Sequence, residues 1–374
     1  MQFIDCDYLN FVKRIQDKKI VLFGASTGWD YHLSVLPALT NDVLDRVLFV
    51  VDNNSLKINQ TCEIAGHVFD IKNPEVLCEC EDVAILIMVR FRYHEAICEQ
   101  LLSYNLSDQI ECFSLQLLYG AKDGADNSCV EKYLAECTKP QIPKKIHSFW
   151  FSGEEKPDNY KRCIESWHKF CPDFEICEWN TENYDVEQNL YMKQAYEKRK
   201  WAFVSDFARL DVVYRYGGIY LDMDVELLAP IDKLLNTSGF FCKQSDGTLD
   251  LGSGFGAPKG FPMIKELLDE YRDLTFIKEN GEMDLLPQPA RLGYIFRKHG
   301  LKHGHDSQIM ENVLALSNDY ITCITGDPNE WRFKGTELGI HWHNGGWMPK
   351  GERDGMSLDS KTKAEIEEKY FKKR

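Results

Sequence analysis

The stretch "RYGGIYLDMDVEL", residues 215–227, decides how this chain is interpreted. An alternating pattern of apolar and acidic residues follows directly after two glycines. With a period of two, one face carries Ile219, Leu221, Met223, Val225 and Leu227, and the other carries Tyr220, Asp222, Asp224 and Glu226. This alternation predicts one continuous strand with a single buried face. The three carboxylates on its other face repel one another unless a cation or water lies between them.

Composition narrows the classes of function. The chain has 374 residues, 44% of them hydrophobic, which predicts two folded domains with sizeable cores. It has 44 basic and 59 acidic residues and a net charge of −15. This charge argues against nucleic acid as a partner, and an anionic substrate must be met by a metal or by a few placed arginines.

The cysteines and the first residues indicate a compartment. Thirteen cysteines are scattered along the chain without the spacing of a disulfide framework, which favours reduced thiols. The opening "MQFIDCDYLNFVKRIQDKK" lacks the apolar core of a signal peptide. We therefore expect a cytoplasmic protein.

The chain is predicted to have four parts. Residues 1–120 alternate strand-like and helix-like segments, which predicts a small Rossmann-like α/β domain. Residues 121–140 form a linker and a connecting helix, 141–350 a second α/β domain, and 351–374 a charged tail.

The first domain only partly matches a dinucleotide-binding fold. Gly24 and Gly28 follow a strand, and Asp52 ends the next one, where such folds place a ribose-binding acid. However, Ser26 stands where the fingerprint requires a glycine. A non-catalytic packing or acceptor-recognition module is favoured over an NAD-linked enzyme.

Two pairs of charged residues are candidates for chemistry. On one strand face, Asp222 and Asp224 would lie roughly 6.5–7 Å apart and could share a divalent cation, with magnesium or manganese preferred by oxygen ligands. The alternative is an edge strand with a solvated acidic face. On the preceding helix, Asp206 and Arg209 are three residues apart and share a face. Their alternative is a structural salt bridge.

Several longer segments extend the pattern. They are "IPKKIHSFWFSG" (142–153), "KRKWAFVSDFARLDVVYRYGGIYLDMDVELLAPIDKLL" (198–235) and "GFGAPKGFP" (254–262). In this order they resemble glycosyltransferase family 32, the DXD-type sugar transferases of the capsular polysaccharide and mannosyltransferase type. The resemblance covers roughly residues 141–350. It implies a GT-A fold, a nucleotide diphosphate sugar donor, Mn²⁺ or Mg²⁺, and retention of anomeric configuration.

The resemblance also implies roles for single residues. Asp222 and Asp224 match the DXD pair, with Asp224 as the direct metal ligand and Asp222 reaching donor and metal. Asp206 and Arg209 match positions that hold the donor sugar, and Tyr220 matches a further donor-site position. Catalytic roles are therefore expected for Asp206, Arg209 and Asp222. Trp150 matches the aromatic residue that stacks on the nucleobase, and its alternative is a core tryptophan.

The C-terminal motif is less regular. In "HWHNGGW", residues 341–347, His341 and Trp347 match a pattern that closes over the diphosphate and metal, whereas Trp342 and Gly346 depart from it. His341 or His343 is a candidate third metal ligand, and the alternative is an aromatic lid with no metal role. The segment "DLLPQPARLG" (284–293) also departs from the Thr-Gly-Pro of the family, which leaves the acceptor side open.

Together these features predict a hexosyltransferase of bacterial surface-polysaccharide assembly. The acceptor would be a glycan or a lipid-linked oligosaccharide. The alternative is a non-catalytic nucleotide-sugar or glycan-binding protein with a degenerate site. The basic residues of the tail predict peripheral contact with the inner face of the plasma membrane, and the alternative is a solvated helix that only aids solubility. These residues are Lys361, Lys363, Lys369, Lys372, Lys373 and Arg374.

Overall fold

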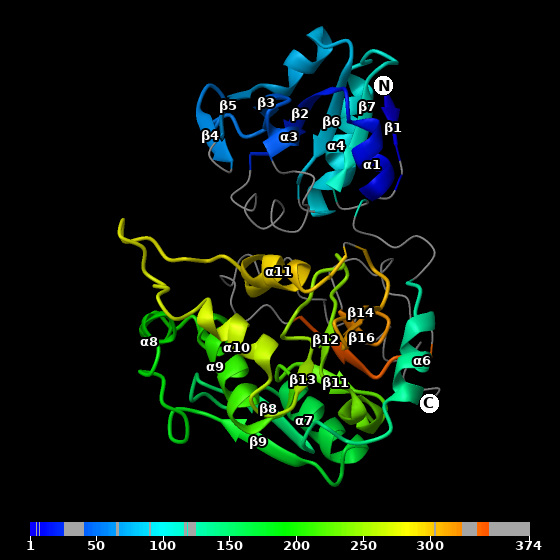
Figure 1. Cartoon of the computed structure of the whole chain (residues 1–374). Coiled ribbons are helices and arrows are strands. Elements are labelled where there is room, and N and C mark those ends of the chain that lie inside the picture. The colour runs from blue at the N-terminus through cyan, green and yellow to red at the C-terminus, as the bar shows by residue number, and fades with distance from the viewer. Residues whose placement is uncertain are drawn as a thin grey trace. The chain divides into compact units, whose positions relative to one another are not determined.

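The chain divides into two compact units, Met1–Lys122 and Asp123–Arg374 (Figure 1). This computed structural model describes residues 1–4, 6, 8–25, 41–64, 67–89, 91–115, 118, 125–302, 304–323 and 335–343. Helix α6 (Ser128–Glu136), within the predicted linker, belongs to the second unit, where Val130 joins the core. The predicted tail, 351–374, lies outside the described residues.

The first unit is a mostly parallel sheet with helices packed against it. Its strand order is β1-β7-β6-β2-β3-β5-β4, and among these pairs β4–β5 is antiparallel. Helix α1 packs on the face that carries Leu22, and α4 packs on the opposite face with Phe23. The elements are β1 (Gln2–Phe3), α1 (Tyr8–Arg14), β2 (Lys19–Phe23), α3 (Asn41–Leu44), β3 (Val47–Val51), β4 (Thr61–Ile64), β5 (His67–Lys72), η2 (Pro74–Glu79), β6 (Val83–Ile87), α4 (Phe91–Ser103) and β7 (Glu111–Ser114).

The carboxylate of Asp52, the candidate ribose-binding acid of this unit, accepts hydrogen bonds from neighbouring parts of its own chain. Its Oδ2 accepts from the backbone N–H of Ala25 at 2.7 Å, and its Oδ1 accepts from that of Asn54 at 2.8 Å. Lys57 Nζ lies 3.4 Å from Oδ2. The carboxylate therefore ties the loop after β2 to the end of β3, which argues further against a dinucleotide site.

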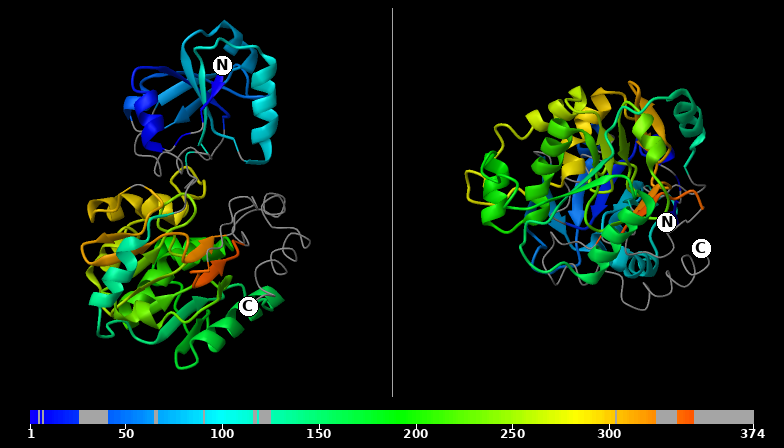
Figure 2. Two further views of the ribbon diagram at one scale, coloured as in Figure 1. Left: turned by 90° about the vertical axis from the view of Figure 1, so that its right-hand side faces the viewer. Right: turned by 90° about the horizontal axis from the view of Figure 1, so that it is seen from below.

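The second unit is built on a mixed sheet of order β14-β15-β12-β13-β10-β8-β9 and a small sheet β11-β17-β16. Figure 2 shows the small sheet, with β16 and β17 in orange, beside the green strands of this unit. The remaining elements are β8 (Lys145–Phe149), α7 (Asp158–Phe170), β9 (Glu175–Trp179), α8 (Leu190–Glu197), α9 (Trp201–Tyr216), β10 (Gly218–Tyr220), β11 (Val225–Leu227), η3 (Asp232–Asn236), β12 (Phe240–Cys242), β13 (Phe255–Ala257), α10 (Pro262–Asp269), α11 (Gln288–Lys298), β14 (Gln308–Met310), β15 (Val313–Leu316), β16 (Ile321–Cys323) and β17 (Gly339–His341).

Both faces of the large sheet are covered. Helices α8, α9, α10 and α11 pack on the face that carries Tyr220 and Phe255. Helix α7, through Trp167, and the small sheet pack on the face that carries Ile219. The predicted α/β class is confirmed for both units. In the part of the chain that the structure describes, no helix is both long and apolar enough to span a membrane.

The prediction of one continuous acidic strand is wrong. Strand β10 ends at Tyr220 in the large sheet, and β11 begins at Val225 in the small sheet. Between them the chain turns, and the N–H of Val225 donates to the carbonyl of Asp222 at 3.0 Å. Tyr220, expected on the polar face, is only 1% exposed. The alternating sequence pattern therefore spans two short strands, each with buried residues, and the turn between them, which carries both aspartates.

Candidate active site

Helix α9 carries the first pair of charges into the interior. It ends at Tyr216, and the next residue, Gly217, has φ 67° and ψ 171°, a conformation that is essentially restricted to glycine. The helix is buried along most of its length, so Asp206 and Arg209 are each only 5% exposed. Arg209 Nη2 lies 3.6 Å from Asp206 Oδ1, as the three-residue spacing predicts.

Arg209 joins the helix to the turn between β10 and β11. Its Nη2 lies 3.5 Å from Asp222 Oδ1, and its guanidinium lies 5.1 Å from the ring centre of Tyr220. The Tyr220 hydroxyl donates to the same Asp222 oxygen at 2.6 Å. Burial opposes the charge on Arg209, but the surrounding acidic groups, Asp222 foremost and Asp206 among the others, together outweigh it and raise the pKa of Arg209, so this side chain stays cationic.

Asp206 is a buried carboxyl group whose pKa is raised above its ordinary value. Burial raises its pKa to about 6, although Arg209 and Arg291 pull in the opposite direction. Asp206 is therefore ionised at neutral pH but close to its titration range. A shift of this kind, with charged partners at close range, is typical of a functional carboxylate.

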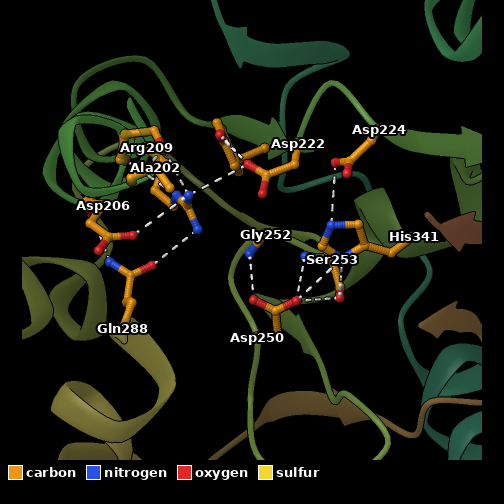
Figure 3. Close-up of polar contacts among 12 residues, drawn as sticks. Ala202, Asp206, Arg209, Asp222, Asp224, Asp250, Gly252, Ser253, Gln288 and His341 are labelled. Atoms are coloured by element: carbon orange, nitrogen blue, oxygen red, sulfur yellow. Dashed lines mark hydrogen bonds and ion pairs between the residues drawn. The ribbon is translucent and has the colours of Figure 1, made fainter. Parts of the chain in front are cut away.

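The pairing of β11 with β17 brings the DXD turn and the C-terminal motif together. Val225 is opposite His341 in this antiparallel pair, and the N–H of Trp342 donates to the carbonyl of Asp224 at 3.0 Å. His341 Nε2 consequently lies 3.3 Å from Asp224 Oδ1 (Figure 3).

Asp222, Asp224 and His341 form a set that fits a divalent cation. Each offers one ligand atom, and these atoms all lie within 4.8 Å of one another. Two carboxylates and one imidazole suit Mn²⁺ or Mg²⁺ better than a thiol-seeking metal. Of the two candidate histidines, His341 is the one that this geometry places with the DXD pair.

Asp250 is a site residue that the sequence interpretation missed. It lies in the loop between β12 and β13, is 8% exposed, and its Oδ2 lies 3.3 Å from His341 Nδ1. Burial opposes its ionisation, but His341, His343 and Ser253 outweigh burial and hold its pKa well below the ordinary value. Its signal is an aspartate at the start of the Gly-rich stretch "LDLGSGFG", residues 249–256, a pattern typical of a tight polar loop.

His343 stands beside this group. Its ring centre lies 4.0 Å from that of His341, and its Nε2 lies 3.9 Å from Asp250 Oδ2. Burial lowers its pKa to about 4, and the neighbouring His341 adds to this effect. The ligand atoms of Asp250, His341 and His343 likewise lie within 4.8 Å of one another, close enough to hold a cation. His341 thus belongs to two adjoining groups.

Glu226, the third acidic residue of the opening stretch, has a different role. Its Oε2 accepts from the Trp342 indole N–H at 2.9 Å and lies 3.1 Å from Arg162 Nη2. The Arg162 guanidinium stacks 5.1 Å from the Trp342 ring. Glu226 therefore anchors the segment that carries His341, and Trp342 is a structural anchor here.

Gln288 was also missed as a residue of the site. It begins α11 within the segment that departs from the family pattern, and it is 3% exposed. Its amide donates to the Asp206 carbonyl at 2.7 Å, and its Oε1 accepts from Arg209 Nη1 at 3.3 Å. At this departure from the family pattern, the side-chain amide of Gln288 therefore forms hydrogen bonds to both charged residues of α9.

The two predicted tryptophans have different outcomes. Trp150 follows β8, which pairs in parallel with β10, so it lies at the strand end where the DXD turn begins. Its indole N–H donates to the Glu154 carbonyl at 2.6 Å, and its ring packs edge-on against Tyr160. Base stacking by Trp150 stays a prediction. Trp347 lies outside the described residues.

Comparisons with known proteins connect the region around the DXD turn with glycosyltransferases. Residues 157–241 match the family described as "Glycosyltransferase sugar-binding region containing DXD motif". Inositol phosphoceramide mannosyltransferase 1 of Schizosaccharomyces pombe is 23% identical over 202 residues, 50% of this chain and 62% of that protein. An uncharacterized glycosyltransferase of Acanthamoeba polyphaga mimivirus is 28% identical over 196 residues, 49% of this chain and 66% of that protein. The chain thus spans less than two thirds of these relatives.

Two solved structures are also similar. The PaToxG glycosyltransferase has 18% identity and a TM-score of 0.34, and the match covers 45% of this chain and 74% of that one. A glycosyltransferase involved in the glycosylation of the major capsid of PBCV-1 has 13% identity and a TM-score of 0.34, and the match covers 56% and 96%. The match to the family confirms the resemblance to DXD glycosyltransferases for the region that contains α9 and the DXD turn.

Proposed function

We propose that this chain, which carries the DXD-containing sugar-binding region of glycosyltransferases, is a cation-dependent, retaining hexosyltransferase. It would move a hexose from a nucleotide diphosphate sugar to a glycan or lipid-linked oligosaccharide. One observation carries the proposal: Asp222, Asp224 and His341 converge within 4.8 Å, directly beside the buried pair Asp206 and Arg209.

The positions of the residues suggest a different role for each group. Asp222, Asp224 and His341 would hold the cation, and Asp206 with Arg209 would orient the donor sugar. When bound, the cation supplies charge neutralisation for the departing diphosphate. The fixed charge of Arg209, already paired with Asp222, needs no rearrangement to face an anionic donor.

The stereochemistry belongs to the same proposal. The acceptor hydroxyl attacks the anomeric carbon from the side of the leaving group. The bond to the acceptor oxygen forms as the bond to the diphosphate oxygen breaks, and the diphosphate takes the hydroxyl proton. Retention is supported by the resemblance, and product analysis by NMR tests it: an inverted anomeric centre would contradict it.

The cellular setting is proposed on narrower grounds. The scattered spacing of the thirteen cysteines is the feature on which we propose a reducing cytoplasm. Assembly of a bacterial capsule or other surface polysaccharide at the inner membrane face is our proposal. The curated relatives named above come from a fission yeast and a virus.

A panel of nucleotide diphosphate sugars tests the activity. Each donor is incubated with the protein and Mn²⁺, Mg²⁺ or EDTA, and released nucleoside diphosphate is measured. We expect release with one donor, dependent on a divalent cation. Binding of a donor without release, with any acceptor tried, would instead support the rival role of a non-catalytic nucleotide-sugar or glycan-binding protein.

A further inference from the structure

The loop between β12 and β13 contacts both sides of the candidate cation site (Figure 3). On the DXD side, the N–H of Asp222 donates to the Gly252 carbonyl at 3.0 Å. On the histidine side, Asp250 and Ser253 both face His341 Nδ1, at 3.3 Å and 2.9 Å. The loop therefore contacts both Asp222 and His341 and sets their positions relative to each other.

Asp250 acts as a hydrogen-bond acceptor within this loop. Its Oδ1 accepts from the Gly252 N–H at 3.0 Å. Its Oδ2 accepts from the Ser253 N–H at 3.1 Å and from the Ser253 hydroxyl at 2.6 Å. A carboxylate that receives three donors from its own loop is fixed in orientation, and Ser253 is fully buried beside it.

The location of the protons follows from the hydrogen-bond network. The Ser253 hydroxyl has one hydrogen, which it donates to Asp250. Its oxygen can then only accept at the 2.9 Å contact with His341, so His341 Nδ1 carries a proton. In neutral imidazole this leaves the lone pair on Nε2, which faces Asp224 Oδ1 at 3.3 Å.

We propose that Asp250 and Ser253 are positioning residues that hold His341 with its Nε2 lone pair toward the cation held by Asp222 and Asp224. This inference rests on the proposed cation-dependent function. Carboxylate and hydroxyl partners of this kind orient histidine ligands, and their loss typically weakens metal affinity 10–100-fold. Neither residue needs to touch the donor.

Mn²⁺ binding to the full chain tests the proposal without requiring the donor. Mn²⁺ alone is titrated into wild type, Asp250→Asn and Ser253→Ala, and free Mn²⁺ is followed by EPR. Asp250→Asn should raise the Kd about 10–100-fold. Ser253→Ala should raise it in the same direction, and it leaves the Asp250 carboxylate and its two backbone donors in place, so it serves if Asp250→Asn does not fold.

Asp211→Asn is the matched control. Asp211 is another buried carboxylate on α9, 9% exposed, and it accepts from the Tyr184 hydroxyl at 2.9 Å and Arg215 Nη1 at 3.1 Å. Its replacement should lower the melting temperature but leave the Mn²⁺ Kd unchanged. A general loss of stability is thereby separated from a loss of positioning.

A spectroscopic signature distinguishes positioning from loop support. Pulsed EPR of the Mn²⁺ complex should show ¹⁴N coupling from an imidazole ligand in wild type and none in His341→Gln. We expect that coupling to be lost or reduced in Asp250→Asn and Ser253→Ala. Wild-type Kd and coupling in both variants would overturn this inference alone. A wild-type chain that binds no Mn²⁺ would overturn both the inference and the proposed cation dependence.

Discussion

Replacing Gly252 by alanine adds one carbon at the point where the loop meets the DXD turn. That carbon would lie 2.5 Å from Asp222 Oδ2, whereas ordinary contacts begin at 3.4 Å. The difference, 3.4 − 2.5, requires the carboxylate to move by about 0.9 Å. Asp222 is also held at its other oxygen by the Tyr220 hydroxyl, so the displacement disturbs a fixed group.

The expected effect falls on function rather than folding. The carbon meets side-chain atoms of Asp222 and, at 3.3 Å, of Asp250 rather than backbone, and Gly252 does not have a positive φ, so the backbone accepts alanine. We expect the free energy of unfolding to change by less than about 1 kcal/mol. A misplacement of about 1 Å at reacting groups costs roughly 100-fold in rate, equivalent to about 2.7 kcal/mol.

The assay is kcat/KM for cation-dependent donor hydrolysis, with the melting temperature measured on the same samples. Gly293→Ala on α11 is the control, because its added carbon meets only the terminal nitrogen of Arg297, at 3.2 Å. That variant should keep wild-type kcat/KM. If Gly252→Ala also stays within twofold of wild type, the placement of Asp222 against this loop is refuted.

Three further predictions concern the donor and cation site. Asp224→Asn should abolish cation-dependent release of nucleoside diphosphate while circular dichroism shows an intact fold, and full wild-type activity in EDTA would contradict the cation role. Trp150→Ala should raise the Kd of the donor nucleotide more than it lowers the melting temperature, and an unchanged Kd would reject base stacking. Because the pKa of Asp206 is raised to about 6 from 3.8, its contribution to stability is fully present below about pH 4 and is lost as pH rises through about 6. Asp206→Asn should therefore gain stability at pH 7.5, by at most about 3 kcal/mol, and gain none at pH 4, while kcat/KM falls; equal effects on stability at both pH values would contradict the shift.

Local patterns predicted the elements around the site well. The shared side of Asp206 and Arg209 on α9 follows from the helical period, which brings residues three positions apart onto one face. The continuous strand over residues 218–227 failed because alternation reports burial but not the sheet to which each residue belongs. Here the chain leaves the large sheet after Tyr220 and joins the small one at Val225.

The sequence by itself determined the α/β class, the DXD pair and the charged pair of α9, because neighbours along the chain set each of these features. It left His341 and His343 as equal candidates and overlooked Asp250 and Gln288. The tertiary structure decided among them, since the register of β11 with β17 places His341 beside Asp224, and the packing of α11 places Gln288 against Arg209. Such contacts depend on backbone pairing between segments distant in the chain, and no periodicity within one segment encodes which partner it meets.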